Sequence, residues 1–277
     1  MTSAATVASR GFPPWVVLHV PHDSTVVPDE VRSQFVLDDE ALRREVVRMT
    51  DHLTHALFAG EPGDAAVVRA PVSRLVVDVE RFADDADEPM AARGMGVVYV
   101  LGSDSTPLRR PLSADEREAL LCDWYRPHHA RLEAAVTRAL ATHGRCLVID
   151  CHSFPSVALP YERVEPNAVR PQICIGTDAF HTDARLADAF VEAFAEAGWR
   201  VARDTPFSGA LVPASRHRSD PRVSAVMVEI DRGLYVDEAD GSALPGFEKF
   251  AARVRSACLR AIERVDALRC PTDDFGP

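Results

Sequence analysis

Residues 145–153 read RCLVIDCHS, a short apolar run that is followed at once by polar residues. An apolar run of this length is typical of a strand buried on both faces, and the polar residues after it are typical of the carboxyl end of such a strand. The same layout occurs at residues 15–24 and 225–232, which contain His22 and Glu229. Because open α/β sheets bind ligands at the carboxyl ends of their strands, we expect these three ends to form one site.

Segments with helical or strand patterns fill the rest of the chain. Helices are predicted over residues 38–58, 113–142, 184–197 and 247–268. The second of these begins with a capping box at Ser113 and is expected to break near Pro127. Short strands or valine-rich runs are predicted over residues 65–70, 75–79, 173–175 and 201–202. This alternation indicates an α/β fold, a three-layer α/β/α sandwich with a mixed, mainly parallel sheet. We expect one domain over residues 13–270, with loose tails at residues 1–12 and 271–277.

Composition limits the function classes. The 277 residues carry a formal net charge of −11, with a pI near 5.4. Proteins that bind nucleic acids or membrane surfaces normally carry a basic face, so a small-molecule substrate is expected instead. The six cysteines are scattered without a CxxC pair, and no stretch approaches the roughly 20 apolar residues of a membrane helix. We therefore expect reduced core thiols and a cytoplasmic protein, either a monomer or a homodimer.

The polar residues at the strand ends suit a metal site. Catalytic zinc typically has three protein ligands among His, Asp and Glu, and a separate carboxylate accepts the proton of a water molecule. His22, Asp51, His152 and Glu229 would fill these roles. Each also has a structural alternative. His22 could be a loop histidine and His152 a hydrogen-bonded core histidine. Asp51 could be a solvated helix acid, and Glu229 could be paired with Arg232. Glu229 is the hardest to explain structurally, because a charge inside an apolar strand costs several kcal/mol unless it is paired or functional.

A resemblance to a known family makes these roles specific. Six blocks occur in order between about Val16 and Glu238: VPHDS (20–24), TD (50–51), SRLVVDVER (73–81), YRPHH (125–129), DCHS (150–153) and VEIDRGLYVDE (228–238). Together they resemble the signature blocks of N-formylglutamate amidohydrolases, a family that is similar in turn to zinc carboxypeptidases. The resemblance implies a zinc-dependent hydrolase that cleaves a small N-acyl amino acid such as N-formylglutamate, giving the amino acid and formate.

The resemblance also implies a role for each matched position. His22, Asp51 and His152 would be the metal ligands, and Glu229 the general base. Arg81 would bind a substrate carboxylate, and Arg74 and Arg232 would lie beside the substrate. The Ser208–Gly209 segment would lie next to the pocket. His129 would polarise the carbonyl or hold a carboxylate. Arg74 could instead pair with Asp78, and His129 could make a structural hydrogen bond. Asp23 is the alternative third ligand, Asp150 would orient a ligand, and Mn²⁺ or Fe²⁺ would suit the same ligands as Zn²⁺.

The chain departs from the family pattern at several positions. Glu80 and Asp231 stand where the family has asparagine, His128 stands where it has tyrosine, and Ser24 replaces a small glycine-type residue. Glu80 would either form a structural pair or compete for the guanidinium of Arg81, and competition would favour a substrate less acidic than N-formylglutamate. Two further hypotheses stay open: another N-acyl amino acid hydrolase or carboxypeptidase-like hydrolase, and a binding protein that keeps the fold without catalysis.

Overall fold

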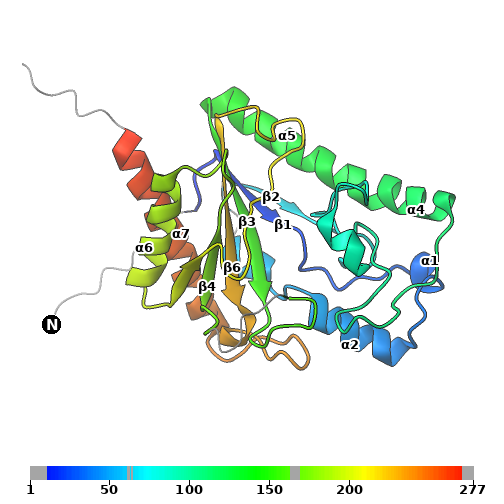
Figure 1. Cartoon of the computed structure of the whole chain (residues 1–277). Helices are drawn as coiled ribbons and strands as arrows, with labels where there is room; N and C mark the ends of the chain where they lie inside the picture. The colour runs from blue at the N-terminus through cyan, green and yellow to red at the C-terminus, as the bar shows by residue number, and fades with distance from the viewer. Residues whose placement is uncertain (1–10, 61–62, 64, 163–168, 270–277) are drawn as a thin grey trace, which may run out of the picture.

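The computed structural model describes residues 11–60, 63, 65–162 and 169–269 (Figure 1). The strands of its sheet are β1 (Val16–Val20), β2 (Ala66–Arg69), β3 (Cys146–Phe154), β4 (Ile173–Gly176), β5 (Val201–Arg203) and β6 (Val223–Asp231). The helices are α1 (Asp29–Arg32), α2 (Asp39–Met49), α3 (Thr54–Phe58), α4 (Ala114–Leu120), α5 (Arg126–His143), α6 (Ala184–Glu196) and α7 (Phe247–Arg269), with 3-10 segments η1 (Pro89–Arg93) and η3 (Arg232–Leu234) and a π-helical turn η2 (Leu121–Tyr125). Most of the two expected tails lies outside the described residues, but Phe12 packs into the core.

The strand order is β2-β1-β3-β6-β4-β5. The four strands β2, β1, β3 and β6 are parallel to one another. The strand β4 pairs with β6 in the antiparallel direction, and β5 pairs with β4 in the parallel direction. The sheet is therefore mixed and mainly parallel, as predicted, and the strands β1, β3 and β6 are neighbours. Two of them are longer than expected, since β3 continues past Ile149 to Phe154 and β6 continues past Glu229 to Asp231. His152 and Glu229 therefore lie within the ladder, opposite each other, and not after the strand ends.

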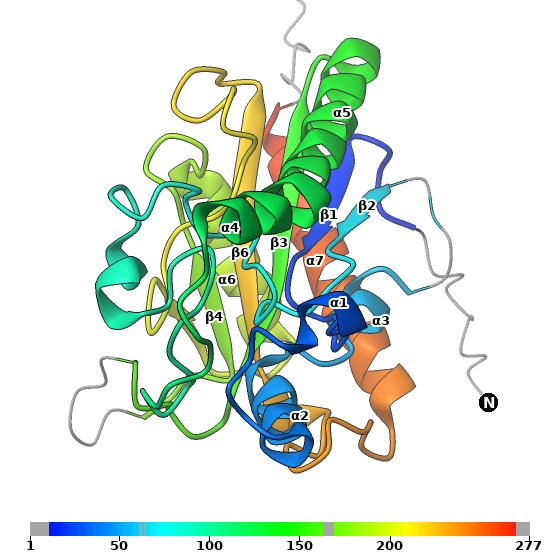
Figure 2. The same ribbon diagram turned by 90° about the vertical axis from the view of Figure 1, so that its right-hand side faces the viewer.

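Helices cover both faces of the sheet (Figure 1). The helices α3, α6 and α7 pack on one face, and α5 packs on the other against β1, β2 and β3. Figure 2 shows α5 in front of the strands that it covers. The predicted three-layer α/β/α sandwich is thus confirmed. Within the described residues no helix is both long and apolar enough to cross a membrane.

Alternation along the strands determines which residues face the candidate site. The residues of β3 that pack beneath α3, α6 and α7 are Leu147, Ile149 and Cys151. Val148 points the other way and packs against α5. Asp150 and His152 share the face of Val148 because side chains of a strand alternate with a period of two. Glu229 lies beside His152 in the neighbouring strand, so both project from the same face.

Some predicted elements need correction. The helix expected over residues 38–58 is split into α2 and α3, because Thr50 is extended and Leu53 adopts a left-handed conformation with a φ of 62°. Residues 75–79 are buried but form turns instead of a strand. The long helix is interrupted near Pro127, as predicted, but by the π-helical turn η2 just before it, and Pro127 itself lies in the first turn of α5. The cysteines are free as expected in the described part of the chain, although Cys122 is exposed.

Candidate metal centre

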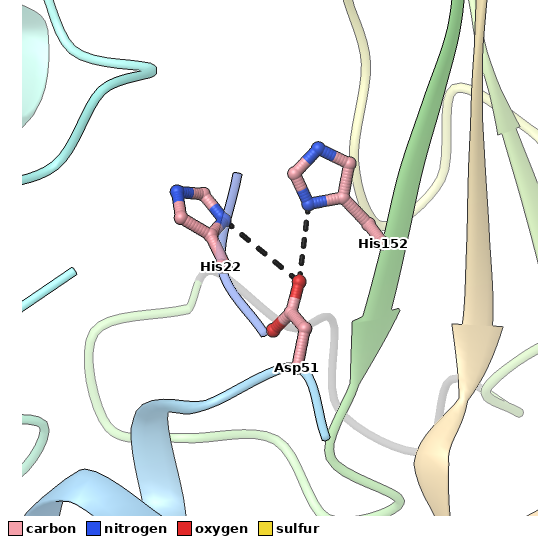
Figure 3. A group of neighbouring side chains, drawn as sticks. All are labelled: His22, Asp51 and His152. Carbon is pink, nitrogen blue, oxygen red and sulfur yellow. Dashed lines mark hydrogen bonds and ion pairs between the residues drawn. The ribbon is translucent and has the colours of Figure 1, made fainter. Parts of the chain in front are cut away.

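Two histidines and an aspartate converge at the carboxyl ends of β1 and β3 (Figure 3). His22 follows β1, His152 lies in β3, and Asp51 lies in the connection between α2 and α3. Asp51 Oδ2 is 3.1 Å from His152 Nδ1 and 3.8 Å from His22 Nδ1, and all three side chains are buried. Ligands bound to one zinc ion at about 2.0–2.2 Å lie about 3.5 Å apart, so small movements would bring these atoms around a single ion. We call these three residues the triad.

The ring of His22 is turned so that one nitrogen is left free. Its Nε2 lies 2.8 Å from Asp78 Oδ1, which is the contact that a ligating histidine usually makes with its outer nitrogen. Its Nδ1 faces Asp51 and is buried without a hydrogen-bond partner. Leaving a buried polar atom unsatisfied costs about 1–3 kcal/mol. A cation bound at the triad would satisfy this atom, so the residues present fit a metal ion.

The outer nitrogen of His152 contacts two carboxylates. Asp150 Oδ1 and Glu80 Oε1 each lie 3.1 Å from His152 Nε2. Asp150 therefore has the orienting position expected for it. Asp150 Oδ1 is also 2.7 Å from His19 Nδ1, and the side chains of His19, Glu80 and Asp150 form a second group of possible ligands. Both ring nitrogens of His19 already have partners, because Nδ1 contacts Asp150 and Nε2 lies 2.8 Å from His128 Nε2, so this group lacks a free nitrogen.

Asp23, the alternative third ligand, is engaged elsewhere. Its Oδ1 lies 2.6 Å from Arg69 Nε, and its Oδ2 accepts a hydrogen bond from the backbone N–H of His55. Asp51, by contrast, belongs to the ligand group that the described residues form with His22 and His152. Its Oδ2 accepts from the backbone N–H of Ser153, and its Oδ1 lies 3.2 Å from an Arg232 guanidinium nitrogen. These contacts hold the carboxylate in place.

The charges around the triad favour protonated histidines when no ion is present. Burial and the nearby Arg74 oppose the charged form of His22, yet neighbouring carboxylates outweigh them and raise its pKa. Burial likewise opposes the charged form of His152, but the carboxylates of Glu80 and Asp150 raise its pKa well above the usual value. Burial works against a charge on Asp51, while the hydrogen bond with His152 and the nearby ring of His22 lower its pKa. A cation would take over the role of these protons.

Glu229 is a carboxylic acid near the triad but outside it. Its side chain is buried, and its Oε2 has no hydrogen-bond partner. Burial, helped by the charges of Asp51 and Glu80 and opposed by His152, raises its pKa to about 8. A cation close by would favour the charged form and bring this pKa down. Glu229 is thus free to exchange a proton with a bound molecule.

The triad and Glu229 line a cavity of about 510 Å³, which is enough for a small ligand. Its arginines are Arg48, Arg74, Arg81 and Arg232. Arg74 forms an ion pair with Asp78 at 2.8 Å, which is the structural pairing considered above as the alternative to substrate binding. It also lines the cavity. Arg81 has a buried Nε without a hydrogen-bond partner, 3.7 Å from Asp78 Oδ2. Among the described residues of the cavity wall, Arg81 is therefore the arginine with a buried donor to spare.

The remaining predicted residues divide into two groups. Ser208 and Gly209 line the cavity, beside Phe207. His129 does not line it, and its Nε2 lies 2.9 Å from the carbonyl oxygen of Val79, with its ring against Tyr125 at 4.2 Å. This is the structural hydrogen bond that was the alternative to a catalytic role. His129 thus supports the backbone next to Glu80.

The structure adds residues that sequence reasoning missed or misplaced. Arg48 and Tyr161 line the cavity without having been predicted, and neither belongs to a motif that would have revealed it. Asp78 was considered only as a partner of Arg74, although its position within a valine-rich run is a signal of a buried, paired charge. Glu80 contacts His152 and not Arg81, so of its two expected alternatives the structure has a pair with another residue and not competition for Arg81.

The fold and the site together define the class of this protein. It is an α/β protein with a mixed sheet, a candidate metal centre at that sheet and the unpaired carboxyl group of Glu229 beside it. The family model described as N-formylglutamate amidohydrolase matches residues 15–236, and the chain belongs to that family. N-formylglutamate deformylase of Pseudomonas putida is 28% identical over 235 residues, which cover 81% of this chain and 83% of that protein. The deformylase of Pseudomonas aeruginosa is 27% identical over 238 residues, 83% of this chain and 84% of that protein.

Solved structures share the fold. N-formylglutamate amidohydrolase from Ralstonia eutropha JMP134 has a TM-score of 0.78 at 23% identity, covering 94% of this chain and 96% of that one. A gene product of Agrobacterium tumefaciens has a TM-score of 0.59 at 21% identity, covering 91% and 92%. A metallo-carboxypeptidase from Burkholderia cenocepacia covers 96% of this chain and 60% of that one at 14% identity, but its TM-score of 0.30 is too low to carry an argument.

Proposed function

We propose that this chain is a zinc-dependent amidohydrolase that cleaves a small N-acyl amino acid, with N-formyl amino acids as the first candidates and formate as a product. The observation that carries the proposal is the free Nδ1 of His22, buried beside Asp51 in a cavity that also holds Glu229. Family membership and the two deformylases of about a quarter identity support the class of substrate. The donor set of two histidines and one carboxylate suits Zn²⁺.

In this proposal the triad would hold the ion through His22 Nδ1, Asp51 Oδ2 and His152 Nδ1. The ion, when bound, supplies Lewis acidity and lowers the pKa of a water molecule towards about 7. Glu229 accepts the proton of the attacking water at its free Oε2 and returns it to the leaving amine. Asp78 and Asp150 keep the histidine rings oriented.

The substrate would be held by its carboxylate. Arg81 has a free, buried donor on the cavity wall, and a guanidinium can grip a carboxylate with two parallel hydrogen bonds. Arg232 and Arg48 add positive charge on the same wall. The α-carboxylate of an N-acyl amino acid would benefit from these groups, whereas Glu80 and Glu88 on the wall would oppose a second carboxylate on its side chain.

The variant Glu229→Gln tests the catalytic role. We expect kcat to fall by about 10²–10⁴-fold, the usual contribution of a general base, while Zn²⁺ content stays at the wild-type level. A matched control is Asp231→Asn, the same carboxylate-to-amide change on the same strand but outside the cavity wall. A zinc-loaded Glu229→Gln protein with wild-type kcat would exclude Glu229 as the base.

The substrate is tested by kcat/KM on N-formylglutamate and on N-formyl derivatives of neutral and basic amino acids. An N-formyl amino acid is expected to be cleaved with release of formate, and Arg81→Met should raise KM for that compound. A zinc-loaded protein that cleaves N-acetyl amino acids or peptides instead would point to another hydrolase of this class. One that cleaves none of these compounds would support a binding protein without catalysis.

A further inference from the structure

The carboxylate of Glu80 contacts the candidate metal centre and no described arginine or lysine. Its Oε1 lies 3.1 Å from His152 Nε2 and 3.8 Å from His19 Nδ1, and its Oε2 lies 3.6 Å from His22 Nδ1. Its side chain is 16% exposed, so water reaches it only in part. The partners of this carboxylate are therefore histidines, two of which belong to the triad.

The arrangement at His152 explains what Glu80 can do there. Metal-ligating histidines commonly donate the outer N–H to one carboxylate, which fixes the ring and makes the other nitrogen a better donor. His152 has two such carboxylates at equal distance, Asp150 and Glu80. A second acceptor adds negative charge on the outer side of this ring.

The balance of charge around the triad is a second, independent reason to connect Glu80 with a bound ion. A ligating histidine is neutral, so with an ion bound the histidines of the triad contribute no positive charge to offset the nearby carboxylates. Four carboxylates then remain at the triad, those of Asp51, Asp78, Asp150 and Glu80, and the charge of Asp78 is balanced by Arg74. A divalent ion together with Arg232, which contacts Asp51, matches the charge of the other three. Without the ion the surplus negative charge is poorly solvated, and buried unpaired charges are costly.

We propose that Glu80 is a positioning residue of the metal centre: it shares the outer N–H of His152 with Asp150, and its charge strengthens the binding of a divalent cation by the triad. This inference rests on the proposed function, because it concerns the same ion. It assigns the carboxylate of Glu80 to the metal centre, on which it acts through His152.

The test compares Zn²⁺ dissociation constants of the wild type, Glu80→Gln and the control Asp231→Asn, each measured by competition with a chromophoric chelator. Asp231 suits the comparison because both of its side-chain hydrogen bonds, with Ser156 and Gly233, use Oδ1, which asparagine retains. We expect Glu80→Gln to bind Zn²⁺ about 10–100-fold more weakly, in the range known for orienting partners of ligands, and the control to stay within about threefold. The visible absorption of the Co²⁺ forms should shift in Glu80→Gln and not in the control.

Zn²⁺ affinity of Glu80→Gln within about threefold of the wild type would overturn the inference, and so would a loss of affinity with an unchanged Co²⁺ spectrum. Glu80→Asn is measured in parallel, so that a folding defect in one variant does not decide the result. A wild-type protein that binds no divalent ion would contradict the proposed function as well. A wild type that binds Zn²⁺ no better than Glu80→Gln would contradict this inference alone.

Discussion

At the scale of single residues, the candidate site is distinguished by buried atoms without hydrogen-bond partners, His22 Nδ1 and Glu229 Oε2 at its centre and Arg81 Nε on its wall. The sequence could point to Glu229, because a glutamate inside an apolar strand must be paired or functional. It could not reveal which nitrogen of His22 is free, since that depends on Asp78, which is distant in sequence and contacts Nε2. Nor could it direct Glu80 to His152, because Arg81 was the nearer cation along the chain.

Zn²⁺ binding should depend on pH in a direction set by the histidines. The raised pKa values of His22 and His152 mean that the metal-free protein keeps protons on these rings to a higher pH than a free imidazole does. An ion must displace those protons, so affinity should rise as the pH rises through the neutral range and fall as it drops. Calorimetric titration in buffers with different ionisation enthalpies measures the protons released. Binding without proton release at pH 7 would contradict these protonation states.

At the scale of elements, long periodic segments were predicted well and irregular ones were not. The helices α6 and α7 and the strands of the sheet follow apolar patterns that packing on the sheet preserves. Asp51 was expected on a helix, but the helix ends before it. The backbone N–H of Asp51 instead donates to the carbonyl of His22, and Thr50 Oγ1 bonds to Val46 O. These are tertiary and capping contacts, which the apolar spacing of residues 38–58 does not encode.

The irregular segment of residues 73–81 is expected to depend on Asp78. This fully buried carboxylate contacts Arg74, Tyr99 and His22. Asp78→Asn would leave Arg74 without its counter-charge, and breaking such a buried pair typically costs about 3–5 kcal/mol. We expect the free energy of unfolding in urea to fall by roughly that amount.

The control for this variant is Asp85→Asn, which removes an exposed pair with Arg117. Exposed pairs contribute about 0–1 kcal/mol, so the control should stay close to the wild type. Equal losses in the two variants would show that the network around Asp78 does not support the fold.

At the scale of the whole molecule, the sheet brings together residues that are far apart in the chain. The triad comes from positions 22, 51 and 152, and Glu229 adds a fourth segment. The adjacency of β1, β3 and β6 follows from the rule that polar strand ends meet at one edge, and it was predictable from the sequence. The antiparallel β4 and the loop that contributes Tyr161 were not, because no local pattern specifies their direction or path.

The most direct test of the metal centre is a crystal of the zinc-loaded protein measured at the zinc absorption edge. One anomalous peak per chain is predicted within about 2.0–2.2 Å of His22 Nδ1, Asp51 Oδ2 and His152 Nδ1, with Glu229 unbound to the ion. The absence of a peak at the triad, or a peak coordinated by Asp23 or by His19 and Asp150 instead, would contradict the account.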